Sequence, residues 1–404
     1  MMQFKMEFFI IQVLLIINII NESFSRFVDQ SLFSRNEVNI EYIPNGRHKN
    51  DALFSSNFTI IKYMSDDEKN KLNNTMEYDV SISAIVDSAD FSFYNQLDAE
   101  EKKFYDIIYS KSSQTIPELE IDVLITDIDT DLQTYYNNMY YKMEKIFTAL
   151  VYENPELWWI GDILFSAYQG DEYNSLIFTF YIVFEGSNFG NYSKEEISNL
   201  NQEIKNEGER IVNKIKKIGL TSQYSILRYI HDYLITKNVY TLDESLKHIR
   251  TLYGGLVDGI CVCEGYAEAF QYLARLFDIN CIIARSYTHE WNFVEINEKW
   301  YILDATYDDP SVYGMDLSSG KNDNLQLEYF LTGTEHESQL NYPKYTEDSS
   351  HTLMYTAYNS GNTVVSYPSI EKKDYVPSEE EKRELSLIDF TFSDINSSGI
   401  YIKF

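Results

Sequence analysis

The stretch Gly259–Phe270, GICVCEGYAEAF, holds two of the three cysteines of this 404-residue chain. After Cys263 the apolar residues recur at steps of three and four, which predicts a helix with one apolar face beginning near that cysteine. The preceding YGGLVDG is rich in glycine and indicates a loop close to the first helical turn. A thiol at a helix N-terminus meets unpaired backbone N–H groups and the positive end of the helix dipole. Both favour the nucleophilic thiolate.

A thiolate in this place needs a cationic partner, and histidine is the usual one. His289 lies in RSYTHEWNFVEI, whose alternation predicts a strand, and EKWYILDATYDDP predicts a second strand after a polar turn at Asn297–Glu298. A hairpin of this kind can bring His289 beside Asp304, which we expect in the middle of the second strand. The carboxylate would orient the imidazole and stabilise its charged form.

The chain resembles the transglutaminase-like superfamily, which has a papain-like core, in three motifs: YGGLVDGICVCEGYA (253–267), HEWN (289–292) and WYILDATYDDP (300–310). The resemblance implies that Cys263 is the nucleophile, His289 the base and Asp304 the orienting acid. It implies an α+β fold in which the helix bearing the cysteine packs on an antiparallel sheet bearing the histidine and the aspartate. Weaker likeness extends from about residue 93 to residue 330. Nothing resembles the calcium sites or flanking β-domains of animal transglutaminases.

Each cysteine also has a structural interpretation. Cys263 could be a small buried helix residue, since free cysteines are among the most buried residues. Acidic neighbours such as Glu264 would raise its pKa if they point inward. We interpret Cys261 as a packing residue and Cys281 as a core strand residue.

Three residues near the motifs are candidates for substrate binding or support. Trp291 is either a core ring or a wall beside the thiol, and Asn292 either orients a loop or assists the site. Asp308 ends the strand in a turn or supports the site. Among the histidines, we interpret His231 as a hydrogen-bonded helix residue and the following as solvated: His48, His248, His336 and His351.

Composition excludes some classes of function. The net charge of −30 leaves no basic stripe for a nucleic-acid backbone. Three cysteines cannot close a disulfide framework, and none has a zinc-binding spacing. We therefore expect neither a metal nor another cofactor. The resemblance implies that the substrate is a protein or peptide.

The N-terminus predicts export. Phe8–Ile20 is a 13-residue apolar run, too short to span a bilayer but suited to a signal peptide, and small residues follow at Ser23 and Ser25. An uncleaved anchor is the alternative. After cleavage we expect no membrane span, and a secreted or cell-surface protein.

The remaining pattern predicts four segments. Residues 1–25 are the signal peptide and 26–90 a polar, poorly ordered leader. Residues 91–345 form the transglutaminase-like domain, with a helical N-terminal part (91–220) and a catalytic core (221–345), and 346–404 are a C-terminal appendage. Helices are expected from Ala99 with Asp98 as cap, over 129–152, and in a long segment ending at Gly219; 175–185 is expected to be a strand.

These features predict an exported cysteine enzyme that transfers acyl groups from protein or peptide amides through a thioester. A peptidase or amidase is favoured over a glutamine-crosslinking transglutaminase, because no calcium or amine-binding module is apparent. A non-catalytic surface binding protein on the same fold is the rival. The sequence does not indicate the substrate, its cleavage preference or the oligomeric state.

Overall fold

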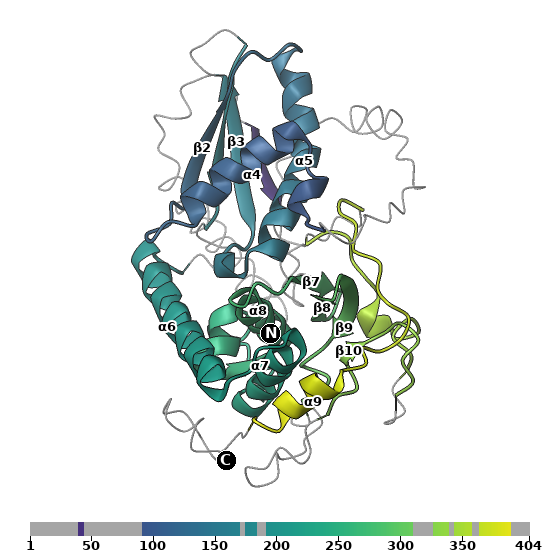
Figure 1. Ribbon diagram of the computed structural model, residues 1–404. Helices are drawn as coiled ribbons and strands as arrows, with labels where there is room; N and C mark the ends of the chain where they lie inside the picture. Colours follow the sequence, from purple (N-terminus) through teal and green to yellow (C-terminus); the bar gives the residue numbers. More distant parts are fainter. Residues whose placement is uncertain are drawn as a thin grey trace, which may run out of the picture.

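A computed structural model describes residues 39–43, 91–169, 174–183, 191–309, 326–338, 343–357 and 363–388. Its elements form a mixed α+β fold in two packed parts (Figure 1). The first part contains α4 (Ala99–Ser112), β2 (Glu120–Ile125), α5 (Leu132–Glu153), β3 (Ile163–Gln169) and β4 (Leu176–Tyr181). An edge strand, β1 (Asn39–Ile43), completes an antiparallel sheet of order β1-β3-β4-β2.

This first sheet corrects the expectation of a mainly helical segment over 91–220. β4 confirms the strand expected at 175–185, but β2 and β3 were not predicted. β2 alternates exposed and buried residues along its whole length, EIDVLI, which is the pattern of a strand with one solvated face. Six or seven residues are too few for this pattern to stand out from neighbouring helices in the sequence alone.

The second part holds the cysteine motif. It is composed of α6 (Lys194–Ile218), α7 (Gln223–Lys237), β5 (Val239–Tyr240), η4 (Gly254–Asp258), β6 (Ile260–Cys261), α8 (Cys263–Arg275), β7 (Cys281–Arg285), β8 (Glu290–Ile296), β9 (Lys299–Leu303), β10 (Phe330–Thr332) and α9 (Glu379–Leu385). Its main sheet is antiparallel with the order β10-β9-β8-β7. α8 packs against β7 and β8, as Figure 1 shows.

Local sequence signals set the helix ends. Asp98 forms a capping box with Glu101 at the start of α4, as predicted. α6 ends at Gly219, whose φ of 90° places it in the left-handed region that glycine favours. Ser222 caps α7, and the Glu384 carboxylate of α9 accepts further hydrogen bonds from Thr221 and Ser222 at the same helix end. The C-terminal helix is thereby anchored to α7.

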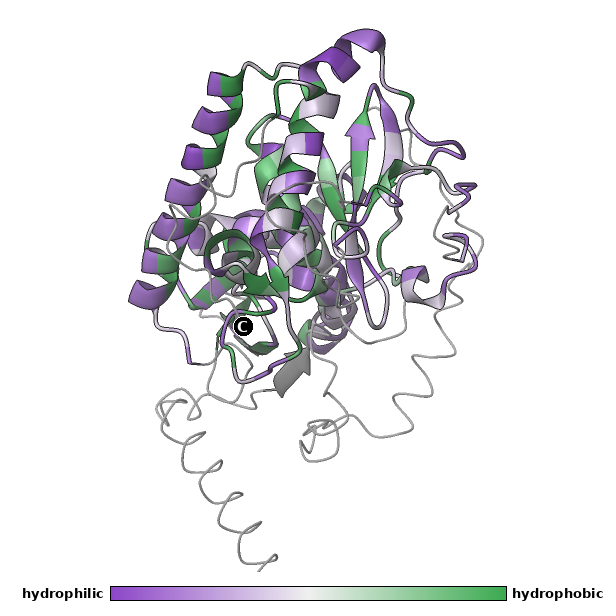
Figure 2. Ribbon diagram, turned by 90° about the horizontal axis from the view of Figure 1, so that it is seen from below, coloured by the Kyte–Doolittle hydropathy of each residue, from purple (hydrophilic) through white to green (hydrophobic). Residues whose placement is uncertain are grey.

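α6 runs along the side of the molecule, where it packs against η4 and approaches the C-terminal end of α8. Its apolar face is buried and its charged face points outward, as the long helix at the left of Figure 2 shows. Gly208 allows the close approach of the two helices. A Cβ there would lie 2.9 Å from Tyr272 Cε1 and 2.9 Å from Leu276 Cδ1.

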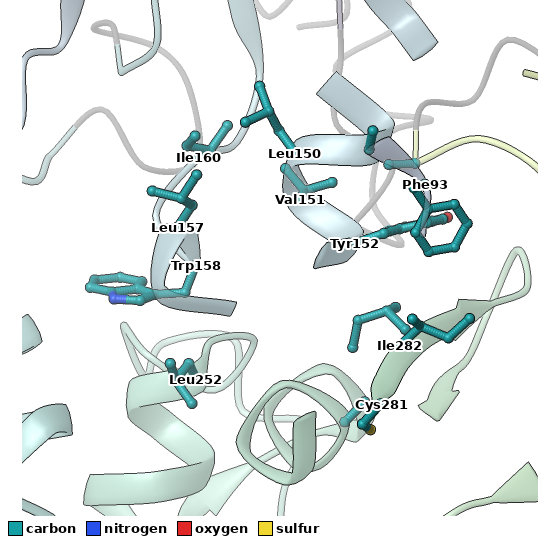
Figure 3. Packing of buried hydrophobic residues seen from close by; sticks show 14 of the residues in the cluster. Phe93, Leu150, Val151, Tyr152, Leu157, Trp158, Ile160, Leu252, Cys281 and Ile282 are labelled. Atoms are coloured by element: carbon teal, nitrogen blue, oxygen red, sulfur yellow. The ribbon is translucent and has the colours of Figure 1, made fainter. Parts of the chain in front are cut away.

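The two parts share one hydrophobic core. Figure 3 shows Tyr152, at the end of α5, above Ile282 and Cys281 of β7, and Trp158 of the following loop above Leu252. Gln271 of α8 joins the two parts, since its Nε2 donates to the backbone oxygens of Tyr152 at 2.6 Å and Cys281 at 3.1 Å. Burial of Cys281 in β7 confirms its interpretation as a core strand residue.

The described residues beyond 346 also belong to this folded unit. Ala357, Val365 and Tyr367 are buried in the shared core. The backbone N–H of Glu371 donates to the Trp300 oxygen of β9 at 2.9 Å. The C-terminal segment therefore packs directly on the sheet that carries the predicted site.

The predictions for the N-terminus fall mostly outside the described residues. This applies to the signal peptide and to the leader, except that five leader residues form β1. Across the described ranges, no helix is both long enough and apolar enough to cross a bilayer.

Candidate active site

Cys263 is the first residue of α8, as the sequence predicts. The segment before it is a π-helical turn, η4, rather than a loop, and it ends at Gly259 with a φ of 73°. Two glycines allow this turn to lie against α8. A Cβ on Gly265 would lie 2.5 Å from Cys261 Cβ, and one on Gly255 would lie 2.0 Å from the Gly265 oxygen. Cys261 is fully buried at this contact, in agreement with its interpretation as a packing residue.

The Cys263 thiol lies in a buried, acidic environment. Its side chain is 3% exposed, and its sulfur donates a hydrogen bond to Glu264 Oε2 at 3.1 Å. Burial and the charge of Glu264 raise the pKa of the Cys263 thiol well above its usual value, while a hydrogen bond from the Glu290 backbone opposes this shift. Both burial and Glu264 therefore favour the protonated thiol.

Arg250 keeps Glu264 ionised. Its Nη1 lies 2.7 Å from Glu264 Oε1, and both side chains are buried. Burial would raise the pKa of Glu264, but the Arg250 charge and the thiol hydrogen bond together hold it below its usual value. Arg250 also pairs with Glu244, which is partly exposed. The thiol thus faces a fixed negative charge.

His289 and Asp304 form a close pair, as predicted. His289 Nε2 lies 2.6 Å from Asp304 Oδ2. Asp304 follows the last residue of β9 instead of standing within the strand, and its Oδ1 accepts from the backbone N–H groups of Thr306 and Tyr307, both at 3.0 Å. Burial alone would raise the pKa of Asp304, yet its histidine partners hold it well below the usual range.

The Cys263 thiol lies beside the backbone that directly follows His289. The side chains of Cys263 and His289 themselves are not hydrogen-bonded to each other. Glu290, whose backbone hydrogen-bonds the sulfur, directly follows His289 in sequence. Among the hydrogen bonds of the described residues, none links Cys263 to His289. Because Asp304 engages Nε2, Nδ1 is the nitrogen of His289 left to exchange a proton with a thiol.

The supporting candidates have distinct places. Trp291 is 1% exposed and stacks on His289 with ring centroids 5.8 Å apart, so it is both a core ring and a wall of the site. Asn292 donates to the oxygens of Ala267 at 3.0 Å and Ile282 at 3.4 Å. It therefore holds α8 on β7 and contacts neither the thiol nor the histidine through these bonds.

Asp308 lies in the turn after β9 and links it to other elements. Its carboxylate accepts from the Tyr329 N–H at 3.0 Å and lies 3.0 Å from His231 Nε2. His231 is fully buried on α7 and also contacts Asp232 at 2.9 Å, which agrees with its interpretation as a hydrogen-bonded helix residue. These bonds fix the turn after β9, where Asp304 stands, to α7.

The sequence interpretation missed His351 and Tyr307. Tyr307 stacks on His289 at 4.7 Å. The prediction that His351 is solvated is wrong: it is 3% exposed, and its Nε2 lies 3.0 Å from Asp304 Oδ2. Its Nδ1 lies 3.0 Å from Asp348, a residue that precedes it by three positions in DSSH. The spacing of Asp348 and His351 was the only sequence signal that His351 has a carboxylate partner. The surrounding polar residues are equally typical of a solvated histidine.

His289, Asp304 and His351 also have the residue types of a metal site. Their ligand atoms lie within 4.8 Å of one another. However, hydrogen bonds already account for their arrangement, because Asp304 Oδ2 accepts from both rings.

Comparisons with known proteins leave the chain without a family assignment. No protein-family model matches it, and no curated protein matches it. One solved structure to which it is similar is described as "Crystal structure of a TGase", with 12% identity and a TM-score of 0.24. The match covers 35% of this chain and 44% of that chain, less than half of either. Similarity at this level establishes neither a shared fold nor a shared activity.

Proposed function

We propose that this protein is a cysteine-dependent acyl-transfer enzyme with a papain-like core of the transglutaminase-like superfamily. Cys263 is the nucleophile, His289 the base and Asp304 the orienting acid. The observation that carries the proposal is the 2.6 Å pair of His289, which directly precedes β8, and Asp304, which directly follows β9. β8 packs against the helix that begins at Cys263. The three motifs quoted from the sequence support the same assignment.

The chemistry follows from these positions. Nδ1 of His289 takes the thiol proton, and the sulfur of Cys263 attacks an amide carbon. Backbone N–H groups in the first turn of α8 stabilise the oxyanion. His289 then gives its proton to the departing amine, leaving a thioester. A second nucleophile loses a proton to His289 as it attacks the thioester, which releases the acyl product and restores the thiol.

Forming the reactive pair requires a small rearrangement. The thiol must exchange its hydrogen bond to Glu264 for one to His289. Hydrogen bonds of catalytic groups are often long or misaligned in ligand-free enzymes and tighten when substrate binds. Substrate that covers the thiol would favour the exchange.

The acyl donor is a protein or peptide amide, and water is the favoured second nucleophile. We therefore favour a peptidase or amidase over a crosslinking transglutaminase, because no calcium or amine-binding module is apparent in the sequence. The apolar run at Phe8–Ile20 supports export, so the enzyme acts outside the cell or at its surface.

A glutamine-containing peptide tests the reaction. Ammonia release and incorporation of a primary amine are measured side by side, with peptide-bond cleavage followed by mass spectrometry. We expect release or cleavage to exceed incorporation and Cys263→Ala to abolish all three. Cys281→Ala, which alters a buried cysteine in β7, is the matched control and should retain activity. Dominant incorporation would support the transglutaminase instead.

One observation favours a second candidate, a non-catalytic binding protein. The thiol donates a hydrogen bond to Glu264, and none of the hydrogen bonds of the described residues joins it to His289. In a binding protein, Cys263, Cys261 and Cys281 would be alkylated slowly and equally. In an enzyme, Cys263 reacts first, and its rate falls when His289 is replaced by alanine.

A further inference from the structure

We propose that His351 is a positioning residue of this site, which acts through Asp304 and limits the negative charge that Asp304 presents to His289. The inference rests on the proposed function. His351 comes from the C-terminal segment, 47 residues after Asp304, and none of the motifs quoted from the sequence includes it.

The hydrogen bonds of His351 determine its charge. Its two ring nitrogens face two carboxylates, Asp304 at 3.0 Å and Asp348 at 3.0 Å. Ionised carboxylates only accept hydrogen bonds, so both ring nitrogens must donate, and a ring with two N–H groups is an imidazolium. Burial opposes this charge, but the two carboxylates raise the pKa of His351 above its usual value.

Aromatic rings fix the position of His351. The ring meets Trp291 edge-on at 4.9 Å and Tyr307 edge-on at 5.1 Å, and lies 5.1 Å from both Tyr329 and Tyr345. These rings come from β8, from the turn after β9 and from the segments around β10. His351 therefore cannot turn away from Asp304 without unpacking several elements.

Asp304 accepts four hydrogen bonds and is held in one orientation. Two backbone N–H groups bind Oδ1, and His289 and His351 share Oδ2. A lone buried carboxylate strongly favours the protonated form of a histidine beside it. With a cation on the same oxygen, this attraction is weaker. His289 can then receive the thiol proton and still give it to the leaving amine.

Other charged or titratable groups also surround the pair. The groups close to His289 are Asp304, His351 and Tyr307. The groups that face His351 are Asp304, Asp348, Tyr329 and Tyr345. The groups near the Cys263 thiol are Glu264, Glu290 and Tyr240. Of these, His351 is the group that brings positive charge to Asp304 besides His289 itself.

Two variants separate charge from hydrogen bonding. His351→Gln can place an amide N–H near the position of Nε2 but carries no charge, whereas His351→Leu loses both. The control is His336→Gln. His336 also lies between two carboxylates, Asp374 at 2.8 Å and Glu328 at 3.7 Å, but shares no partner with Asp304.

The first readout is the pH dependence of Cys263 alkylation, which needs no substrate. We expect the acid limb of the rate profile to move to higher pH by on the order of one unit in His351→Gln. Asp304 then presents its full negative charge to His289. With an amide substrate, kcat should fall severalfold at neutral pH with KM unchanged, and His351→Leu should lose more. His336→Gln should match the wild type.

The outcomes distinguish the two proposals. If His289→Ala leaves Cys263 alkylation unchanged, the proposed function is wrong and the inference falls with it. If His289→Ala slows alkylation but His351→Gln keeps the wild-type pH profile, only the role of His351 is overturned. A loss of thermal stability without a change in the profile would also make His351 merely structural.

Discussion

The thiol of Cys263 donates a hydrogen bond across 3.1 Å to the carboxylate of Glu264, the next residue in the chain. A negative charge at this place suppresses the thiolate, against the effect of the helix N-terminus. The first turn of α8 therefore combines a feature that activates the thiol with one that holds it protonated. Glu264 is the residue to alter in testing this balance.

Glu264→Gln should increase the reactivity of Cys263. The substitution removes the charge that raises the pKa of the thiol, and a decrease of one pKa unit is a tenfold gain in thiolate at a pH below the pKa. We expect alkylation at pH 7 to accelerate by on the order of tenfold, measured by mass spectrometry of the Cys263 peptide. Glu244→Gln, on the other side of Arg250, should react at the wild-type rate. A slower reaction in Glu264→Gln would contradict this assignment.

Asp304→Asn should abolish turnover while retaining the fold. An amide cannot accept from both backbone N–H groups and both rings, so His289 loses its orienting acceptor. We expect kcat to fall on the order of a thousandfold or more. Circular dichroism should remain unchanged, and Asn292→Asp, which perturbs a neighbouring packing contact, would serve as a comparison for stability loss. Retention of near wild-type kcat would eliminate Asp304 from the mechanism.

Gly265→Ala should displace the thiol. The new Cβ would lie 2.5 Å from Cys261 Cβ and 3.2 Å from the Gly255 nitrogen, so α8 must move away from η4. We expect a loss of about 1–3 kcal/mol in the free energy of unfolding and a large drop in activity.

Gly219→Ala is the control for that substitution. Gly219 has a φ of 90° with nothing within 4 Å of an added Cβ. The change should reduce stability by roughly 1–2 kcal/mol through backbone strain alone. Cys263 alkylation should stay at the wild-type rate. Equal effects of both substitutions on alkylation would show that the close contact at Gly265 does not position the thiol.

Glu207→Gln should destabilise the contact between α6 and α7 in a pH-dependent manner. The Glu207 carboxylate binds Arg210 Nε at 2.8 Å, Tyr233 Oη at 2.6 Å and Lys237 Nζ at 3.2 Å. Burial raises the pKa of Glu207, but these partners outweigh it and lower the pKa from 4.5 to about 2. Because the folded-state pKa is lowered, the stabilisation is complete above the unfolded pKa and disappears as the pH falls towards 2.

Denaturant unfolding at several pH values measures this effect. We expect Glu207→Gln to cost about 2–3 kcal/mol at pH 7 and progressively less below pH 4.5. Glu209→Gln is the matched control on the same helix, since Glu209 is exposed and lies 4.0 Å from Lys205. Its stability should equal that of the wild type. A cost for Glu207→Gln that is constant from pH 7 to pH 3 would disprove the electrostatic origin.

Local patterns predicted elements in both parts of the fold. The helix from Cys263, the cap at Asp98, the stop at Gly219 and the hairpin around Asn297–Glu298 are each encoded within a few residues. Such features depend on helix periodicity, cap chemistry and turn residues, all of which are visible in a short window.

Contacts between distant segments were the part that could not be predicted. Asp304 meets His351 only because the C-terminal segment folds back on the sheet, and no periodicity in either segment indicates it. The pairing of β1 with β3 likewise joins residues far apart in sequence. The hydrogen bond from the Cys263 thiol to Glu264, instead of to His289, was also not predictable. It depends on side-chain rotamers, which the order of the motifs does not determine.

The link between Asp304 and His351 also constrains how the site is assembled during synthesis. A ribosome makes the helix of Cys263 and the strands of His289 and Asp304 before it makes residue 351. Until the later segment has emerged and docked, the Asp304 carboxylate of the nascent chain would have His289 and two backbone N–H groups as partners, but not His351. If the proposed function holds, the protein would therefore acquire its mature proton-transfer behaviour only at a late stage of folding, after Cys263 is already in place.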